Sequence, residues 1–168
     1  MGVDLEGIIR ELAPGLIRYC TARTRDRGLA EEIAQDSLAA LVQRWKHHGA
    51  PDSPEAFCFA IARRRAARAM ARRRLWLPLR VLTAGRDHSQ DFESASLARC
   101  ECADLHAALA LLSAQDREAL LLVAVAGLKT SEAARVFEIS ESAFKMRISR
   151  ARQRLRSLME DRHEPARR

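Results

Sequence analysis

The sequence is poor in aromatic residues and in the residues that make turns. Among its 168 residues are one tyrosine, two tryptophans and five phenylalanines, with seven glycines and five prolines. A turn-rich β-sandwich needs more of both kinds. Its apolar fraction of 48% comes mostly from alanine, leucine, isoleucine and valine. Because alanine and leucine are strong helix formers, this composition favours a core of packed helices.

A long apolar run, a secretory leader pattern and a disulfide framework are also missing. No stretch approaches the roughly 20 apolar residues that cross a bilayer, and the N-terminus lacks the basic-then-apolar layout of a signal peptide. Four cysteines do not make a secreted disulfide scaffold in a chain of this length. Cys20 and Cys58 fall within apolar helical patterns, where a reduced thiol acts as a small hydrophobe. These features predict a cytoplasmic protein without membrane insertion.

Motifs of catalysis and of metal binding are absent as well. The sequence has no Gly-rich phosphate loop, no nucleophile elbow and no H-E-x-x-H pair. Cys100, Cys102 and His106 form the spacing C-x-C-x-x-x-H, which matches no common zinc template. The sequence therefore predicts a protein that is not an enzyme and that holds neither a cofactor nor a metal.

Basic residues are in excess. Lysine and arginine total 29 against 22 acidic residues, which gives a formal charge of +7 and a pI near 10.0. Such a balance predicts a polyanionic partner. Nucleic acid is the first candidate, and an anionic membrane surface is the second.

Apolar residues at helical spacing predict three helices in the first half. The first covers Leu5 to Cys20 as two helical pieces with a bend at Pro14 and Gly15, and the second runs from about Leu29 to Lys46. The third begins at Ser53, a good N-cap, and its far half is almost wholly basic. The small and polar residues of 83–96 then predict an interdomain linker.

Four helices are expected in the second half, with caps at Ser113, Thr130 and Ser140 and a left-handed stop at Gly127. They cover residues 104–112, 114–125, 130–137 and 140–159. The fold class predicted is all-α, with two small helical domains joined by a flexible linker. The expected bounds are 1–80 for the first domain, 81–102 for the linker, 103–162 for the second domain and 163–168 for a basic tail.

The segment 130–152 has the parts of a helix-turn-helix. Ala133 and Ala134 are small where two helices must approach closely, Ile139 plugs the turn, and Phe144 and Ile148 anchor the second helix by its inner face. This spacing leaves the following residues pointing outward: Ser142, Ala143, Lys145, Met146, Ser149 and Arg150. A helix with small residues at its start and cations further along can enter a major groove.

Lys145, Arg147 and Arg150 are then expected to reach phosphates or guanine edges. The alternative is a basic helix that is merely solvated. We expect the cationic row from Lys145 to Arg156 to lack acidic partners four residues earlier, which argues against a surface salt-bridge lattice and favours DNA binding.

The run ALALLSAQDREALLLVAVAGLKTSEAARVFEISESAFKMRISRARQRLRSLM resembles region 4 of sigma-70-type factors. The matching residues are Leu112, Arg117, Glu118, Gly127, Leu128, Glu132, Ala134, Ile139, Ser140, Lys145, Arg147, Arg150, Ala151 and Arg152. The departures are Ser113 for the family's Pro, Glu138 where Gly is common, Ala143 for Thr and Met146 for the frequent Ser. The resemblance implies that this segment binds an upstream promoter box, with Thr130 and Ser140 beside the outward residues named above.

Region 2 of the same family resembles the first half. The stretch AEEIAQDSLAALVQRW is similar to the helix that docks on the polymerase β′ clamp, which implies that Glu32, Gln35 and Asp36 face the polymerase. These residues could equally be ordinary acids and amides near a helix start, where they favour the helix dipole.

The stretch EAFCFAIARRRAARAM resembles the family's segment that captures unstacked bases of the downstream box. By this resemblance the DNA contacts are Arg63, Arg64, Arg68 and Arg72. A basic helix lying on an anionic membrane surface is the rival interpretation, weakened by the alanine-rich opposite face.

Together these segments imply a sigma factor of the extracytoplasmic-function type, which directs RNA polymerase core to promoters and assists DNA melting. The implied partners are promoter DNA and the β′ clamp and β flap of the core polymerase. An anti-sigma factor is a further partner that the resemblance allows. Two alternatives remain open at this point. One is an autonomous helix-turn-helix regulator that binds operator DNA without polymerase as a dimer, and the other is a polymerase-binding adaptor that does not read DNA.

Overall fold

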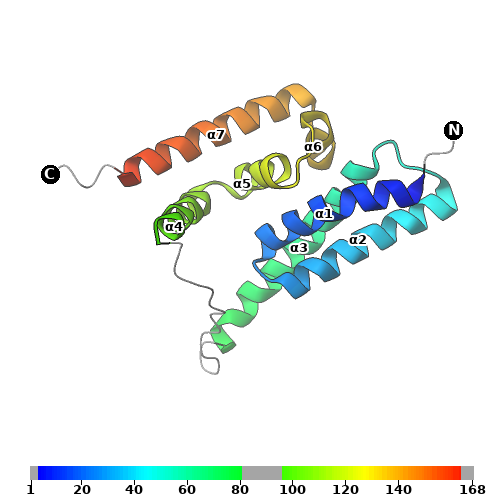
Figure 1. The fold of residues 1–168 in the computed structure, drawn as a ribbon, viewed down its shortest axis with the longest axis horizontal. Helices are drawn as coiled ribbons and strands as arrows, with labels where there is room; N and C mark the ends of the chain where they lie inside the picture. The colour runs from blue at the N-terminus through cyan, green and yellow to red at the C-terminus, as the bar shows by residue number, and fades with distance from the viewer. Residues whose placement is uncertain (1–3, 81–95, 164–168) are drawn as a thin grey trace.

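The computed structural model describes residues 4–80 and 96–163, with side chains for residues 4–73 and 104–161. All elements in these ranges are helical, which confirms the all-α fold class with two helical regions (Figure 1). They are α1 (Leu5–Thr24), α2 (Arg27–His48), α3 (Pro54–Arg80), α4 (Ser96–Leu111), α5 (Ala114–Leu120), the π-helical turn η1 (Leu121–Val125), α6 (Thr130–Phe137) and α7 (Glu141–His163). Residues 81–95, which make up most of the predicted linker (81–102), lie outside the described residues.

The first three helices pack into a bundle (Figure 1), and large side chains are buried between them. Leu16, Leu41 and Phe59 are buried there, and the rings of Tyr19 and Phe59 meet edge to face with centroids 5.5 Å apart. α1 is continuous through Pro14, so the predicted division into two helical pieces was wrong. Pro14 lies on the exposed face of α1, where water can satisfy the carbonyl that loses its helical partner.

Side-chain caps set the starts of the helices in the first bundle. Asp26 accepts a hydrogen bond from the Leu29 N–H at 2.9 Å, so α2 begins at Arg27 and not at Leu29. Glu32 therefore lies beyond the first turn, contrary to the sequence expectation. Ser53 caps α3 as predicted, because its Oγ accepts from the Ala56 N–H at 3.2 Å.

Caps in the second half follow the prediction with one exception. Ser113 and Ser140 accept hydrogen bonds from backbone N–H groups at the starts of α5 and α7, and Gly127 has a φ of 80°. Thr130 is not a cap. Lys129 takes that position, and its N–H donates to the Glu132 carboxylate at 2.8 Å.

Two helix bounds in the second half also differ from those expected. The helix predicted from residue 104 begins earlier, at Ser96, within the expected linker, and the helix predicted over 114–125 changes to π-helical geometry at Leu121. A π-helical turn leaves the regular ladder of hydrogen bonds, and periodicity of apolar residues does not signal such a change.

The two halves pack against each other through α1 with η1 and through α3 with α6. The backbones come so close that a Cβ on Gly15 would lie 2.9 Å from the Ala126 carbonyl oxygen. Buried residues of both halves form one apolar cluster, with Leu16 on one side and Leu122 on the other. Glycine at position 15 therefore allows the docking of α1 on the second half.

Candidate nucleic-acid interface

The turn between α6 and α7 keeps the left-handed geometry for which glycine is usual. Glu138 ends α6 with φ 57° and ψ 39°, and the Ile139 N–H donates to the Ala134 carbonyl at 3.1 Å. The Cβ of Glu138 makes this conformation costly by about 1 kcal/mol, which the packing of the two helices must offset.

The inner face of the helix-turn-helix is packed as predicted. Ala133 and Ala134 are buried where the helices approach, and Phe144 and Ile148 are buried under α7. The rings of Phe137 and Phe144 lie 5.4 Å apart. These contacts fix the rotation of α7 about its axis and therefore decide which of its residues face solvent.

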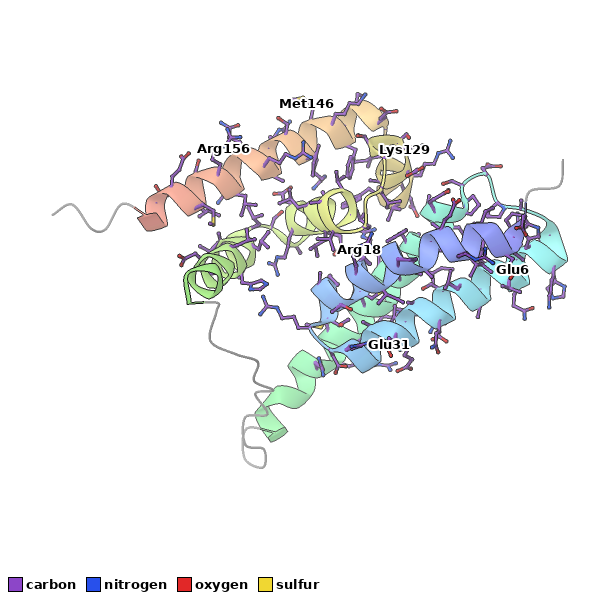
Figure 2. All side chains as sticks on the ribbon, viewed as in Figure 1. Glu6, Arg18, Glu31, Lys129, Met146 and Arg156 are labelled. Atoms are coloured by element: carbon purple, nitrogen blue, oxygen red, sulfur yellow. The ribbon has the colours of Figure 1, made fainter. Side chains whose placement is uncertain are left out.

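The outer face of α7 is open. All six residues predicted to point outward are exposed: Ser142, Ala143, Lys145, Met146, Ser149 and Arg150. Met146 has 56% of its surface exposed, which is high for a large apolar side chain (Figure 2). A shallow hollow of about 420 Å³ is lined by Asp116, Ala143, Met146, Arg147 and Arg150.

Arg147 braces α7 against α5. Its Nη1 donates to Gln115 Oε1 at 2.6 Å and lies 3.7 Å from Asp116 Oδ1. The guanidinium carbon is 5.7 Å from the centroid of the Phe137 ring, a cation–π contact. Arg147 is thus held within the protein, and its contact with DNA stays a prediction.

The cationic row of α7 is partly paired, and the expectation that it lacks acidic partners was wrong. Lys145 Nζ lies 2.7 Å from Glu141 Oε1, one helical turn earlier. In the part of the chain that the structure describes, Arg150, Arg152, Arg154 and Arg156 are exposed and form no ion pair. The positive field of α7 therefore comes mainly from its middle and its end.

Some basic residues of α3 are exposed to solvent, and others contact neighbouring helices. Arg64, Arg68 and Arg72 are exposed. Arg63 instead points to α6, where its guanidinium lies 4.6 Å from the Phe137 ring centroid and Nη1 donates to the Val136 carbonyl at 3.4 Å. The structure thus places three of the four predicted arginines on an open surface.

The predicted polymerase-facing residues lie together on α2. Glu32 and Gln35 are exposed. Asp36 is half-buried and forms an ion pair with Arg65 of α3. Arg65 therefore ties this surface to the basic helix, a connection that the sequence did not indicate.

A buried acid lies between the halves, in a position that the sequence did not indicate. Glu118 of α5 accepts hydrogen bonds from the Tyr19 hydroxyl and, at 2.9 Å, from Arg23 Nε. Burial, together with the neighbouring Glu118 carboxylate, raises the pKa of Tyr19 well above its usual value. Arg18 Nε donates to the Val125 carbonyl of η1 at 3.2 Å (Figure 2). The sequence indicated Glu118 only as a match to the family and gave no sign of its partners.

The described residues hold no cluster of three or more histidine, cysteine or acidic side chains suited to a metal. His106 is exposed, and the side chains of Cys100 and Cys102 lie outside the described residues. Within the same ranges, no helix has the length and apolar character needed to cross a membrane.

The fold and this surface define a two-part helical protein whose second part presents a basic recognition helix. Residues 8–75 match the family model described as Sigma-70 region 2, and residues 102–155 match the model described as Sigma-70, region 4. The chain therefore belongs to the sigma-70 family, as a sigma factor of the extracytoplasmic-function type.

Two solved structures share the fold. The sigma factor RpoE in complex with the anti-sigma factor NepR from Bartonella quintana is 24% identical, with a TM-score of 0.64 over 92% of this chain and 96% of that chain. CnrH in complex with the cytosolic domain of CnrY is 22% identical, with a TM-score of 0.64 over 94% of this chain and 88% of that chain. No curated protein sequence matches this chain.

Proposed function

We propose that this sigma factor directs RNA polymerase core to specific promoters and assists the melting of DNA at the start site. The observation that carries the proposal is α7, whose inner face is locked by Phe144 and Ile148 while its outer face is open and basic. The sigma factor family is not enzymatic. All chemistry accordingly stays with the polymerase, and the chain acts in the cytoplasm without catalytic residue or cofactor.

The second domain, residues 103–162, binds the upstream promoter box and contacts the β flap. Base edges and phosphates are contacted by the outward face of α7, by Arg147, and by Thr130 and Ser140 at the helix starts. Ser140 is exposed beside the start of α7, which supports its place at the DNA backbone. The basic tail, residues 163–168, extends the same positive charge.

The first domain, residues 1–80, binds the β′ clamp and the opened downstream box. Glu32, Gln35 and Asp36 form the polymerase contact. The opened strand follows the basic face of α3, given by Arg63, Arg64, Arg68 and Arg72. Because Arg63 now holds Phe137 and Val136, it can reach DNA only when the two halves separate across the linker, residues 81–102.

An anti-sigma factor is a further proposed partner. Two of the solved structures that share the fold, at 24% and 22% identity, are complexes, one with an anti-sigma factor and one with the cytosolic domain of CnrY. A partner that keeps the halves together would hold Arg63 away from DNA.

Run-off transcription with purified core polymerase on genomic fragments tests the proposal. We expect a new start site that requires this chain and that is lost or weakened in Arg150→Ala. Lys46→Ala, which removes an exposed cation at the end of α2, is the matched control and should leave the start site intact. Specific DNA binding without polymerase would instead favour the autonomous regulator. Full activity after neutralisation of Lys145, Arg147 and Arg150 would favour the adaptor.

The polymerase contact is tested separately by capture of core polymerase on the immobilised chain. Glu32→Arg places a cation where a basic partner surface is expected and should reduce capture at least tenfold. Glu6→Arg, also exposed but on α1, should bind like the unchanged chain. Equal capture by the two variants would remove Glu32 from the interface.

A further inference from the structure

The outer face of α7 carries an apolar surface amid its polar residues. Ala143 and Met146 are three residues apart and therefore neighbours on one face of the helix. Both are exposed, and both line the hollow of about 420 Å³ beside α5. Met146 is labelled on the N-terminal half of α7 in Figure 2. Among the described residues Met146 is one of four large apolar side chains that are exposed, and of these four it alone lies on α7.

The two cations beside these residues, Lys145 and Arg147, interact with other side chains of the protein. Lys145 lies 2.7 Å from Glu141, and Arg147 is bound to Gln115 and the Phe137 ring. Neither is free to form a bidentate contact with a guanine edge without giving up a partner. Arg150, one turn beyond, remains exposed and unpaired within the described residues. The central contact that α7 offers to a base pair is therefore apolar.

Only one group in the major groove is suited to an apolar contact with such a side chain. Thymine alone presents a methyl group there, and the remaining base edges present hydrogen-bond donors and acceptors. A flexible, polarizable methionine can follow the position of such a methyl group, and the small Ala143 allows the helix to approach the bases. Arg150 has the reach and charge to hold the neighbouring phosphate.

We propose that Ala143 and Met146 recognise thymine in the upstream promoter box through its 5-methyl group. This inference rests on the proposed function, since it requires α7 to enter the major groove. Burying one methyl group stabilises a complex by about 0.8 kcal/mol, which corresponds to about a fourfold change in affinity. Loss of one recognised methyl group should therefore weaken binding by about that factor.

Selection and deoxyuridine substitution test the proposal. Core polymerase carrying the full chain selects duplexes from a pool with a randomised segment, and each thymidine of the selected upstream box is then replaced by deoxyuridine, which lacks the methyl group. We expect at least one replacement to weaken binding by about fourfold. Met146→Ser should bind the thymidine and deoxyuridine duplexes equally at that position. Ser157→Ala, an exposed serine further along the same helix and outside the proposed DNA-contacting residues, should keep the difference.

Each other outcome overturns the inference. If no deoxyuridine replacement weakens binding, or if Met146→Ser keeps the full difference, the apolar surface does not recognise thymine. If Met146→Ser instead reduces the affinity for core polymerase, Met146 belongs to a protein interface. If the loaded polymerase selects no sequence at all, the proposed function fails together with the inference. Selection without any methyl dependence leaves the proposed function intact and removes only this proposal.

Discussion

Arg23 donates its Nε–H to Glu118 Oε2 over 2.9 Å, and this ion pair joins helix α1 of the first half to α5 of the second. The Tyr19 hydroxyl donates to the other carboxylate oxygen. Glu118 is only 6% exposed, so both of its oxygens depend on these two donors. A buried carboxylate without such partners would be strongly unfavourable, and the pair therefore selects one way of docking the halves.

Replacing Glu118 with alanine should lower the free energy of unfolding by about 2 kcal/mol, because it removes two hydrogen bonds to a charged group between the halves. Urea unfolding followed by circular dichroism measures the change. Glu31→Ala is the control, since its ion pair with Arg27 is exposed and should contribute no more than about 0.5 kcal/mol. Equal losses in the two variants would contradict a special role for Glu118.

Replacing Arg147 should mainly lower stability, whereas replacing Arg150 should mainly weaken promoter binding. Arg147→Ala removes the brace on Gln115 and Phe137 and should lower the free energy of unfolding by about 1 kcal/mol. Arg150→Ala should leave stability within about 0.5 kcal/mol and weaken promoter binding about fivefold or more. Unfolding and promoter-binding titrations on the same preparations separate the two effects. An Arg147→Ala chain as stable as the unchanged chain would refute the bracing contact.

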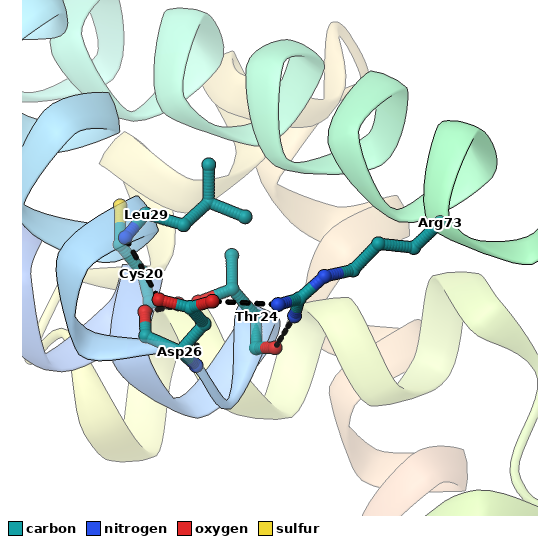
Figure 3. A network of polar contacts seen from close by, with 5 residues as sticks. All are labelled: Cys20, Thr24, Asp26, Leu29 and Arg73. Carbon is teal, nitrogen blue, oxygen red and sulfur yellow. Dashed lines mark hydrogen bonds and ion pairs between the residues drawn. The ribbon is translucent and has the colours of Figure 1, made fainter. Parts of the chain in front are cut away.

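Asp26 should make stability depend on acid pH through the polar contacts of its carboxylate, which Figure 3 shows. The hydrogen bond from the Leu29 N–H, together with Arg73 Nη2 at 2.6 Å, lowers the pKa of Asp26 below its ordinary 3.8. Because the pKa of Asp26 is lower in the folded chain than in the unfolded chain, its ionised carboxylate stabilises the fold at pH values above the ordinary pKa of 3.8. This stabilisation is lost as the pH falls through the lowered pKa.

Two substitutions separate the parts played by Asp26. Asp26→Asn keeps an N-cap but loses the charge, so its stability should fall less steeply below pH 4 than that of the unchanged chain. Asp26→Ala should cost about 1 kcal/mol more at neutral pH through the lost cap. Unfolding titrations across acid pH measure both, and identical pH profiles for the Asn variant and the unchanged chain would exclude the charge effect.

Cys20 and Cys58 should resist thiol reagents in the native protein. Burial raises the pKa of each thiol from 9.0 to about 12, so almost no thiolate is present near neutral pH. In a chain with Cys100→Ser and Cys102→Ser, labelling by a thiol-reactive dye should be slow without urea and rapid in urea. Rapid labelling of either thiol in the absence of urea would show that its surroundings open to solvent.

Local features of this protein were readable from its residues alone. Ser113 and Ser140 cap helices, Gly127 takes a left-handed conformation, and Phe144 and Ile148 form the inner face of α7. These features depend on neighbours within one or two helical turns, so spacing and side-chain type are sufficient to predict them. The family also follows from such runs of residues.

The tertiary structure alone decided which charged residues are available to a partner. Arg63 reaches Val136 across 73 positions, Arg23 reaches Glu118 across 95, and Asp36 meets Arg65 between two helices. No spacing along the chain indicates these pairs, because they form only when distant helices dock. An arginine side chain is long enough to reach either solvent or a buried acceptor. The packing of α1 and α3 against the second half determines which of the two each arginine reaches.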